Sequence, residues 1–316
     1  MNAISRRDFV RLSTAAAFSA AGAPLLSPFN AHAIEPFKRT GKARLQLSLA
    51  AYSFREFFKD SAHKRSKEPV PDKAIDLFNF IDFCAEHGCD GAELTAYYFP
   101  KDVTDEYLLK VRRHAFLRGV AVSGTSVGNN FAHPKGEKRD QEIADVKRWI
   151  DRAAVLGAPH IRIFAGVPPK GTDPTTARAM CLDAIEECCD YAGRHGIFLG
   201  LENHGGIVAT PEELLDLVKR VKSPWFGVNL DTGNFRIADP YAGLTQAAPY
   251  AVNVQLKAEI NRGEKGADEP ADLPRLVKIL RDANYQGFVA LEYEAKEDPW
   301  TAVPRLLKQM KELFAG

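Results

Sequence analysis

The sequence contains little cysteine. Its 316 residues include five cysteines, and an odd number cannot all pair within one chain. None occurs in Cys-x-x-Cys spacing, so the sequence indicates neither a disulfide framework nor a thiolate metal site. All fall in or beside expected helices, where cysteine often acts as a small core residue. They are Cys84, Cys89, Cys181, Cys188 and Cys189.

The sequence also lacks an excess of charge. Its formal net charge is +1, although 26% of the residues are charged. Such a chain has no overall field that attracts nucleic acid or an acidic membrane, so we expect no nucleic-acid partner. Long apolar runs are missing too. The most apolar stretch near the N-terminus, 12–26, is too short and too weakly apolar for a stable membrane span.

Residues 1–33 are expected to be an export signal. The pair Arg6-Arg7 precedes Phe9 and a mildly apolar run, and Ala31-His32-Ala33 provides a small-x-small cleavage site. This order is typical of a twin-arginine signal peptide; an amphipathic N-terminal helix is the alternative. The sequence therefore predicts an interaction with the twin-arginine translocase, a periplasmic or otherwise exported location, and one folded domain over 34–316.

The remainder of the chain alternates eight apolar, β-rich runs with eight helical patterns. The expected strands cover 46–53, 91–97, 120–127, 160–165, 197–203, 226–231, 251–257 and 287–293. The expected helices cover 72–87, 104–118, 138–156, 174–195, 211–221, 240–248, 272–284 and 299–314. Because neighbouring parallel strands need a crossover helix each time, this alternation predicts an α/β protein with a single (β/α)8 TIM barrel.

Several expected strands alternate apolar and polar residues up to their C-terminal ends. The outer face of a barrel strand packs on helices and is apolar, so the polar alternates must point toward the barrel axis. Charged groups buried there need partners or a metal. The C-terminal ends of such strands are also where an α/β barrel places its chemistry. The residues expected to face the barrel axis are Glu93, Gly200, Glu202, His204, Asn253, Gln255, Lys257, Glu259, Glu292 and Glu294.

Four consecutive strands, from the fifth to the eighth, each contribute one oxygen-bearing side chain at this end. Three are carboxylates and one is an amide, and oxygen-rich sets of this kind suit hard divalent ions. The sequence therefore predicts one divalent cation, Mn²⁺ or Mg²⁺. The expected ligands are Glu202, Asp231, Gln255 and Glu292.

Four motifs, LENHGG, NLDTGN, VQLKAE and LEYE, resemble the xylose isomerase-like TIM barrel superfamily, and in particular its sugar phosphate isomerase/epimerase group. The resemblance covers about 46–314. It implies a metal site on the residues just named, with Glu202 and Glu292 as the acid/base pair. Two positions depart from the family pattern. Gln255 stands where the family usually has a histidine ligand, and this replacement of nitrogen by oxygen weakens the case for zinc and favours Mn²⁺ or Mg²⁺. Asn234 stands where the family often has histidine, and it could hydrogen-bond a substrate hydroxyl.

Other polar residues are expected to line the same pocket. Candidate substrate-binding residues are His204, Asn234, Lys257, Glu93 and His133. For His204 a purely structural role remains an alternative, and for His133 a solvated position in a loop. Arg162 on the fourth strand is expected to pair with Glu93 inside the barrel.

Together these features predict a divalent-metal-dependent sugar isomerase or epimerase. Such an enzyme would abstract a proton next to a carbonyl and stabilise an enediolate. A 3-keto-glycoside lyase or hydrolase using the same metal site is one alternative, and a non-catalytic periplasmic sugar-binding protein is another. An abasic-site nuclease is disfavoured, because the related nucleases use a histidine-rich trinuclear zinc site. The sugar, the metal and any homo-oligomeric state are left open.

Overall fold

The computed structural model of the protein describes residues 34–62, 71–263 and 266–316. The expected signal peptide, residues 1–33, lies outside the described residues. In the described ranges, no helix is both long enough and apolar enough to cross a membrane.

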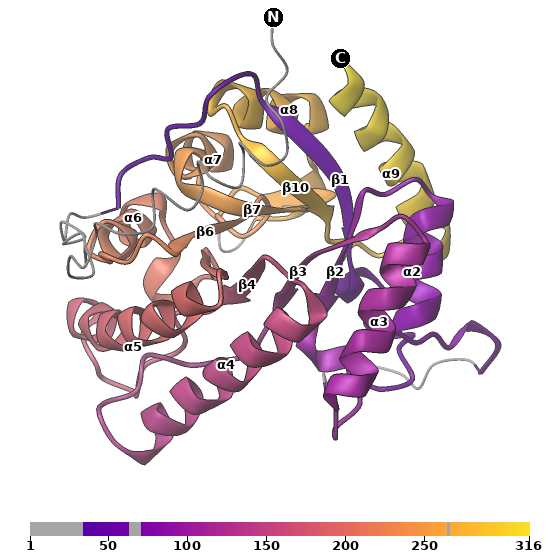
Figure 1. Ribbon diagram of the computed structural model, residues 1–316. Coiled ribbons are helices and arrows are strands. Elements are labelled where there is room, and N and C mark those ends of the chain that lie inside the picture. The colour runs from indigo at the N-terminus through magenta and orange to yellow at the C-terminus, as the bar shows by residue number, and fades with distance from the viewer. Residues whose placement is uncertain (1–33, 63–70, 264–265) are drawn as a thin grey trace, which may run out of the picture. The chain divides into compact units, whose positions relative to one another are not determined.

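Eight parallel strands form a closed barrel in the order β1-β10-β7-β6-β5-β4-β3-β2. The strands are β1 (Arg44–Ala50), β2 (Gly91–Thr95), β3 (Ala121–Ser126), β4 (His160–Ile163), β5 (Phe198–Glu202), β6 (Phe226–Asp231), β7 (Ala251–Leu256) and β10 (Gln286–Leu291). The first and last of these pair directly and close the barrel (Figure 1). The expected (β/α)8 TIM barrel is therefore confirmed.

Helices follow the strands and lie around the outside of the barrel (Figure 1). They are α2 (Leu77–Glu86), α3 (Asp105–Leu117), α4 (Glu137–Leu156), α5 (Pro174–Arg194), α6 (Pro211–Val218), α7 (Pro240–Ala247), α8 (Leu273–Asp282) and α9 (Pro299–Ala315). Side chains that accept hydrogen bonds from the first helical turn explain several starts. Thr210 and Glu213 form a complete capping box at the start of α6.

Two local features differ from the sequence-based expectation. The helix expected from residue 72 begins instead at Leu77, because Asp76 accepts hydrogen bonds from Phe78 and Asn79 and so caps the helix there. An antiparallel hairpin, β8 (Glu259–Asn261) with β9 (Asp268–Pro270), was not expected. Strands of three residues are too short to show the alternation by which a strand is recognised in sequence.

Strand parity separates an apolar outer layer from a polar interior. Leu199 and Leu201 are fully buried, while the intervening Gly200 and the following Glu202 belong to the inner face. Deep in the barrel Ser48 and Ser123 share a hydrogen bond of 2.7 Å. Polar side chains therefore fill the barrel interior in hydrogen-bonded layers, and those layers support the site above them.

Gly124 on β3 illustrates how tightly this interior is filled. A Cβ atom at Gly124 would lie 1.8 Å from Cε1 of the buried His160 ring. We expect Gly124→Ala to lower the free energy of unfolding by about 1–3 kcal/mol, since overpacking forces neighbours to move. Urea denaturation measures the change. His160→Ala removes the ring, so the double variant should lose less than the sum of the two single losses. Additive losses would contradict this packing.

Candidate functional site

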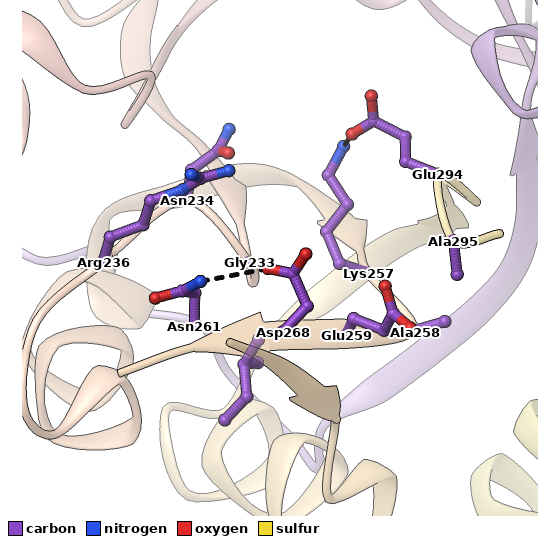
Figure 2. Close-up of a pocket in the computed structure, with 11 residues that line it drawn as sticks. Gly233, Asn234, Arg236, Lys257, Ala258, Glu259, Asn261, Asp268, Glu294 and Ala295 are labelled. Carbon is purple, nitrogen blue, oxygen red and sulfur yellow. Dashed lines mark hydrogen bonds and ion pairs between the residues drawn. The ribbon is translucent and has the colours of Figure 1, made fainter. Parts of the chain in front are cut away.

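A cleft of about 250 Å³ opens where the loops after β6, β7 and β10 meet (Figure 2). These are the C-terminal ends of barrel strands, where barrel enzymes place their chemistry. The side chains around it are polar and of both charges. They include Asn234, Arg236, Lys257, Glu259, Asn261 and Glu294. Asn234 and Lys257, two of the expected substrate-binding residues, therefore face one cavity.

Glu202, at the end of β5, is held by one ion pair and two hydrogen bonds. Arg162 Nε lies 2.9 Å from its Oε2 atom, and His204 Nδ1 and Asn234 Nδ2 contact its Oε1 atom at 2.8 and 2.9 Å. Burial of the carboxylate works against its ionised form, but Arg162 and His204 outweigh it and lower the pKa of Glu202. Glu202 is therefore an ionised carboxylate with a fixed orientation.

The pairing of Arg162 expected from the sequence is wrong. Arg162 pairs with Glu202, whereas both oxygens of Glu93 accept hydrogen bonds from the amides of Gln255 and Asn253. The reason is the strand register: Glu93 is opposite Gly124, whereas Arg162 is opposite Ser126, two residues nearer the C-terminal end of β3. The Arg162 guanidinium also lies over the ring of Phe164, 3.9 Å from its centroid.

Asp231 ends β6 and is positioned by its neighbours. Asn203 is not among the inward-facing residues expected from strand parity. Its side-chain amide donates to the Asp231 carbonyl and accepts from the Asp231 backbone amide, both at 2.9 Å. The Gly233 amide donates to Asp231 Oδ1 at 2.8 Å. Burial raises the pKa of Asp231 to about 6, although Lys257 opposes the rise. An asparagine that hydrogen-bonds a neighbouring strand end gives no signal in a single sequence.

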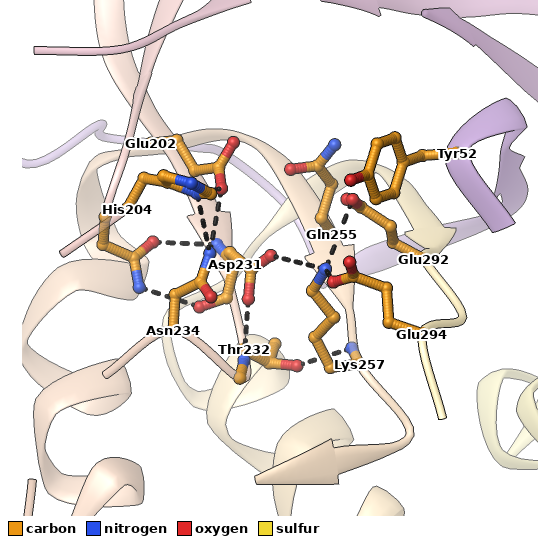
Figure 3. Close-up of polar contacts among 12 residues, drawn as sticks. Tyr52, Glu202, His204, Asp231, Thr232, Asn234, Gln255, Lys257, Glu292 and Glu294 are labelled. Carbon is orange, nitrogen blue, oxygen red and sulfur yellow. Dashed lines mark hydrogen bonds and ion pairs between the residues drawn. The ribbon is translucent and has the colours of Figure 1, made fainter. Parts of the chain in front are cut away.

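Lys257 lies among three carboxylates (Figure 3). Its ammonium nitrogen is 3.3 Å from Asp231 Oδ2 and 3.2 Å from Glu292 Oε1, and it also contacts Glu294. Burial raises the pKa of Glu292 to about 7, and the nearby Asp231 charge adds to the rise while Lys257 opposes it. Figure 3 also places the Tyr52 ring beside Glu292, a neighbour that the sequence did not reveal.

The remaining expected site residues take other positions. Gln255 lies in a buried amide network, where its Oε1 atom accepts from Asn229 and its Nε2 atom donates to Glu93, both at 2.6 Å. Glu93 is fully buried, and its two oxygens accept hydrogen bonds from the amides of Gln255 and Asn253. His133 lines a different hollow, beside Pro134 and Val167. His204 is exposed at the mouth, with its ring centroid 4.5 Å from that of Phe164.

The oxygen atoms of this site suit a divalent cation. Among residues 34–62, 71–263 and 266–316, no three His, Cys, Asp or Glu side chains converge as metal ligands. However, Asp231 Oδ2 and Glu292 Oε2 are buried and accept no hydrogen bond from the described residues. Buried oxygens of this kind need a partner, and carboxylate oxygens are the donors that hard divalent cations prefer. Gln255 Oε1 retains a second lone pair.

Comparison with known proteins identifies the family. The model of the xylose isomerase-like TIM barrel family matches residues 81–312. The chain belongs to this family. A human protein named "Putative hydroxypyruvate isomerase" is 25% identical to this chain over 232 residues, which is 67% of this chain and 82% of that protein.

Solved structures of similar fold include enzymes of sugar metabolism. A D-psicose 3-epimerase from Clostridium cellulolyticum H10, solved with D-tagatose, aligns with a TM-score of 0.64 and 18% identity, covering 86% of this chain and 92% of that one. The IOLI protein, solved with a bound zinc atom, aligns with a TM-score of 0.65 and 18% identity, covering 85% and 96%. At these identities the likeness shows the shared xylose isomerase-like barrel.

His204 provides a test of the electrostatics around Glu202. The hydrogen bond to Glu202 raises the pKa of His204 above its usual value of about 6.5. We expect Glu202→Gln to lower the pKa of His204, because a neutral amide does not stabilise imidazolium. NMR titration of the ring protons in chelator-treated protein measures both values. Glu292→Gln is the control and should leave the His204 titration in place; equal titrations in wild type and Glu202→Gln would refute the pairing.

Proposed function

We propose that the protein is an isomerase or epimerase of a small carbohydrate and moves a proton at the carbon next to a carbonyl. The observation that carries this proposal is the contrast between two buried carboxylates that contact cleft-lining side chains. Arg162 and His204 outweigh burial and lower the pKa of Glu202, whereas burial raises the pKa of Glu292 to about 7. Pairs of carboxylates whose environments separate their pKa values are typical of acid/base catalysis.

The two carboxylates have distinct roles in this mechanism. Glu202 accepts the proton from carbon, because it is ionised at neutral pH and has a fixed orientation. Glu292, whose pKa burial raises to about 7 in the metal-free site, returns a proton to the neighbouring carbon or to the opposite face. In the reverse reaction the roles exchange. His204 and Asn234, which contact Glu202, face the substrate hydroxyl groups.

A divalent cation, Mn²⁺ or Mg²⁺, belongs to this proposal. Asp231, Glu292, Glu202 and the Gln255 amide oxygen would hold it. That set is supported by two buried oxygens that accept no hydrogen bond from the described residues, Asp231 Oδ2 and Glu292 Oε2. When bound, the ion stabilises negative charge that develops on the carbonyl oxygen. The zinc-bound structural neighbour supports a divalent ion, and an oxygen rather than a nitrogen donor at Gln255 favours Mn²⁺ or Mg²⁺ over zinc.

The substrate is proposed to be a free or oxidised sugar rather than a sugar phosphate. The cleft is lined by amides, carboxylates and cations, which suit a polyhydroxylated ligand. The twin-arginine motif within residues 1–33 supports an exported protein that meets its substrate outside the cytoplasm, where phosphorylated sugars are scarce. The translocase is then a transient partner. The proposed substrate and the proposed export do not depend on whether the protein forms homo-oligomers.

We expect Glu292→Gln to abolish turnover, because a neutral amide neither takes nor returns a proton, while the fold is retained. Metal-supplemented incubation with mono- and disaccharides, including 3-keto forms, followed by NMR of the products, measures turnover. Glu297→Gln is the matched control: it removes an exposed carboxylate that follows the same strand and should keep full activity.

The product spectrum separates the alternatives. A new stereoisomer or an aldose–ketose pair supports the proposal. Release of an aglycone from a 3-keto-glycoside would instead identify elimination after the same first proton transfer. Saturable binding with no product would identify a sugar-binding protein. Turnover retained in Glu292→Gln would remove Glu292 from the chemistry.

A further inference from the structure

The Lys257 side chain lies between the open cleft and two buried carboxylates. Asp231 is fully buried and Glu292 is 8% exposed, while Lys257 itself is 8% exposed and lines the cleft. On the cleft side the ammonium contacts Glu294, whose side chain is 39% exposed. A cation entering from the cleft toward Asp231 and Glu292 therefore meets the Lys257 ammonium first (Figure 3).

The Lys257 side chain is positioned by its surroundings. Its backbone amide donates to Thr232 Oγ1 at 2.9 Å. A Cβ atom at Gly233 would come within 2.7 Å of Lys257 Cγ, so the aliphatic part of the lysine packs directly on the Gly233 backbone. The ammonium is thus directed toward the carboxylates.

The ammonium neutralises the negative charge of Asp231 and Glu292, which a divalent ion would otherwise neutralise. It lies 3.3 Å from Asp231 Oδ2 and 3.2 Å from Glu292 Oε1. Like charges a few ångström apart repel strongly where water is excluded. A divalent ion on Asp231 and Glu292 and an ammonium at its present position therefore exclude each other.

We propose that Lys257 is a built-in competitor of the metal. Its ammonium neutralises Asp231 and Glu292 in the metal-free protein, and when a divalent cation binds it moves away from these two carboxylates and keeps only its contact with Glu294. This inference rests on the metal site of the proposed function. The negative charges of Asp231 and Glu292 are thus neutralised by the ammonium in the metal-free protein and by the cation in the metal-bound protein. The fold therefore does not depend on metal.

Two substitutions should change metal affinity in opposite directions. Lys257→Met removes the competitor, so Mn²⁺ should bind about tenfold tighter or more, the scale on which groups surrounding a site alter metal affinity. Glu294→Gln removes the one carboxylate that still pairs with the ammonium after metal has bound, so Mn²⁺ should bind more weakly than in wild type. Lys73→Met, which removes an exposed lysine paired with Asp298, should leave the affinity unchanged.

Isothermal titration of chelator-treated full-length protein with MnCl₂ measures these affinities. Thermal melting provides a second readout: without metal, Lys257→Met should melt at a lower temperature than wild type, and Mn²⁺ should remove the difference. If Lys257→Met does not fold without metal, Lys257→Gln, which keeps a hydrogen-bond donor without the charge, takes its place in both measurements.

Equal or weaker Mn²⁺ binding by the Lys257 variant would overturn the inference, and so would failure of both proteins to bind Mn²⁺. These outcomes are separable from the proposed reaction. Tighter binding by the variant together with turnover in Glu292→Gln would retain the competition and remove the proposed proton transfer. Unchanged Mn²⁺ binding by Lys257→Met together with loss of turnover in Glu292→Gln would remove the competition and retain the proposed proton transfer.

Discussion

The balance of charge inside the barrel mouth is the constraint on which this site depends. Several carboxylates are buried where water cannot solvate them, and each needs a cation or donors at short range. Arg162 supplies the cation for Glu202, and Lys257 supplies it for Asp231 and Glu292. Glu202 has both Arg162 and His204 beside it, whereas Asp231 and Glu292 are buried next to one another and share a single ammonium, so the pKa of Glu202 is lowered and those of Asp231 and Glu292 are raised.

The barrel explains how these residues come together. Parallel strands end at the same rim, so side chains far apart in sequence converge there without any long loop to position them. The layers below are hydrogen-bonded amides and serines rather than apolar groups. Glu93, Asn229, Asn253 and Gln255 form such a layer beneath the cleft. This network holds Gln255 in place, and its amides donate to both oxygens of Glu93.

The strand pattern made much of the fold and the inner residues predictable, since side chains alternate strictly along a strand and the outer face must be apolar. Depth along the barrel axis was not predictable, because it depends on the stagger between strands. For this reason the sequence paired Arg162 with Glu93 rather than with Glu202. The path of the Lys257 side chain, the anchoring role of Asn203 and the three-residue strands beside the cleft left no periodic signal either.

Movement of a proton on and off carbon is the central claim. The direct measurement is incorporation of solvent deuterium into substrate and product in D₂O, followed by NMR with a carbohydrate that the protein converts. The account predicts deuterium at the carbon next to the carbonyl, since Glu202 and Glu292 exchange their protons with solvent between turnovers. Product formed with no deuterium at that carbon would mean that hydrogen moves without a carboxylate intermediary, and would contradict the account.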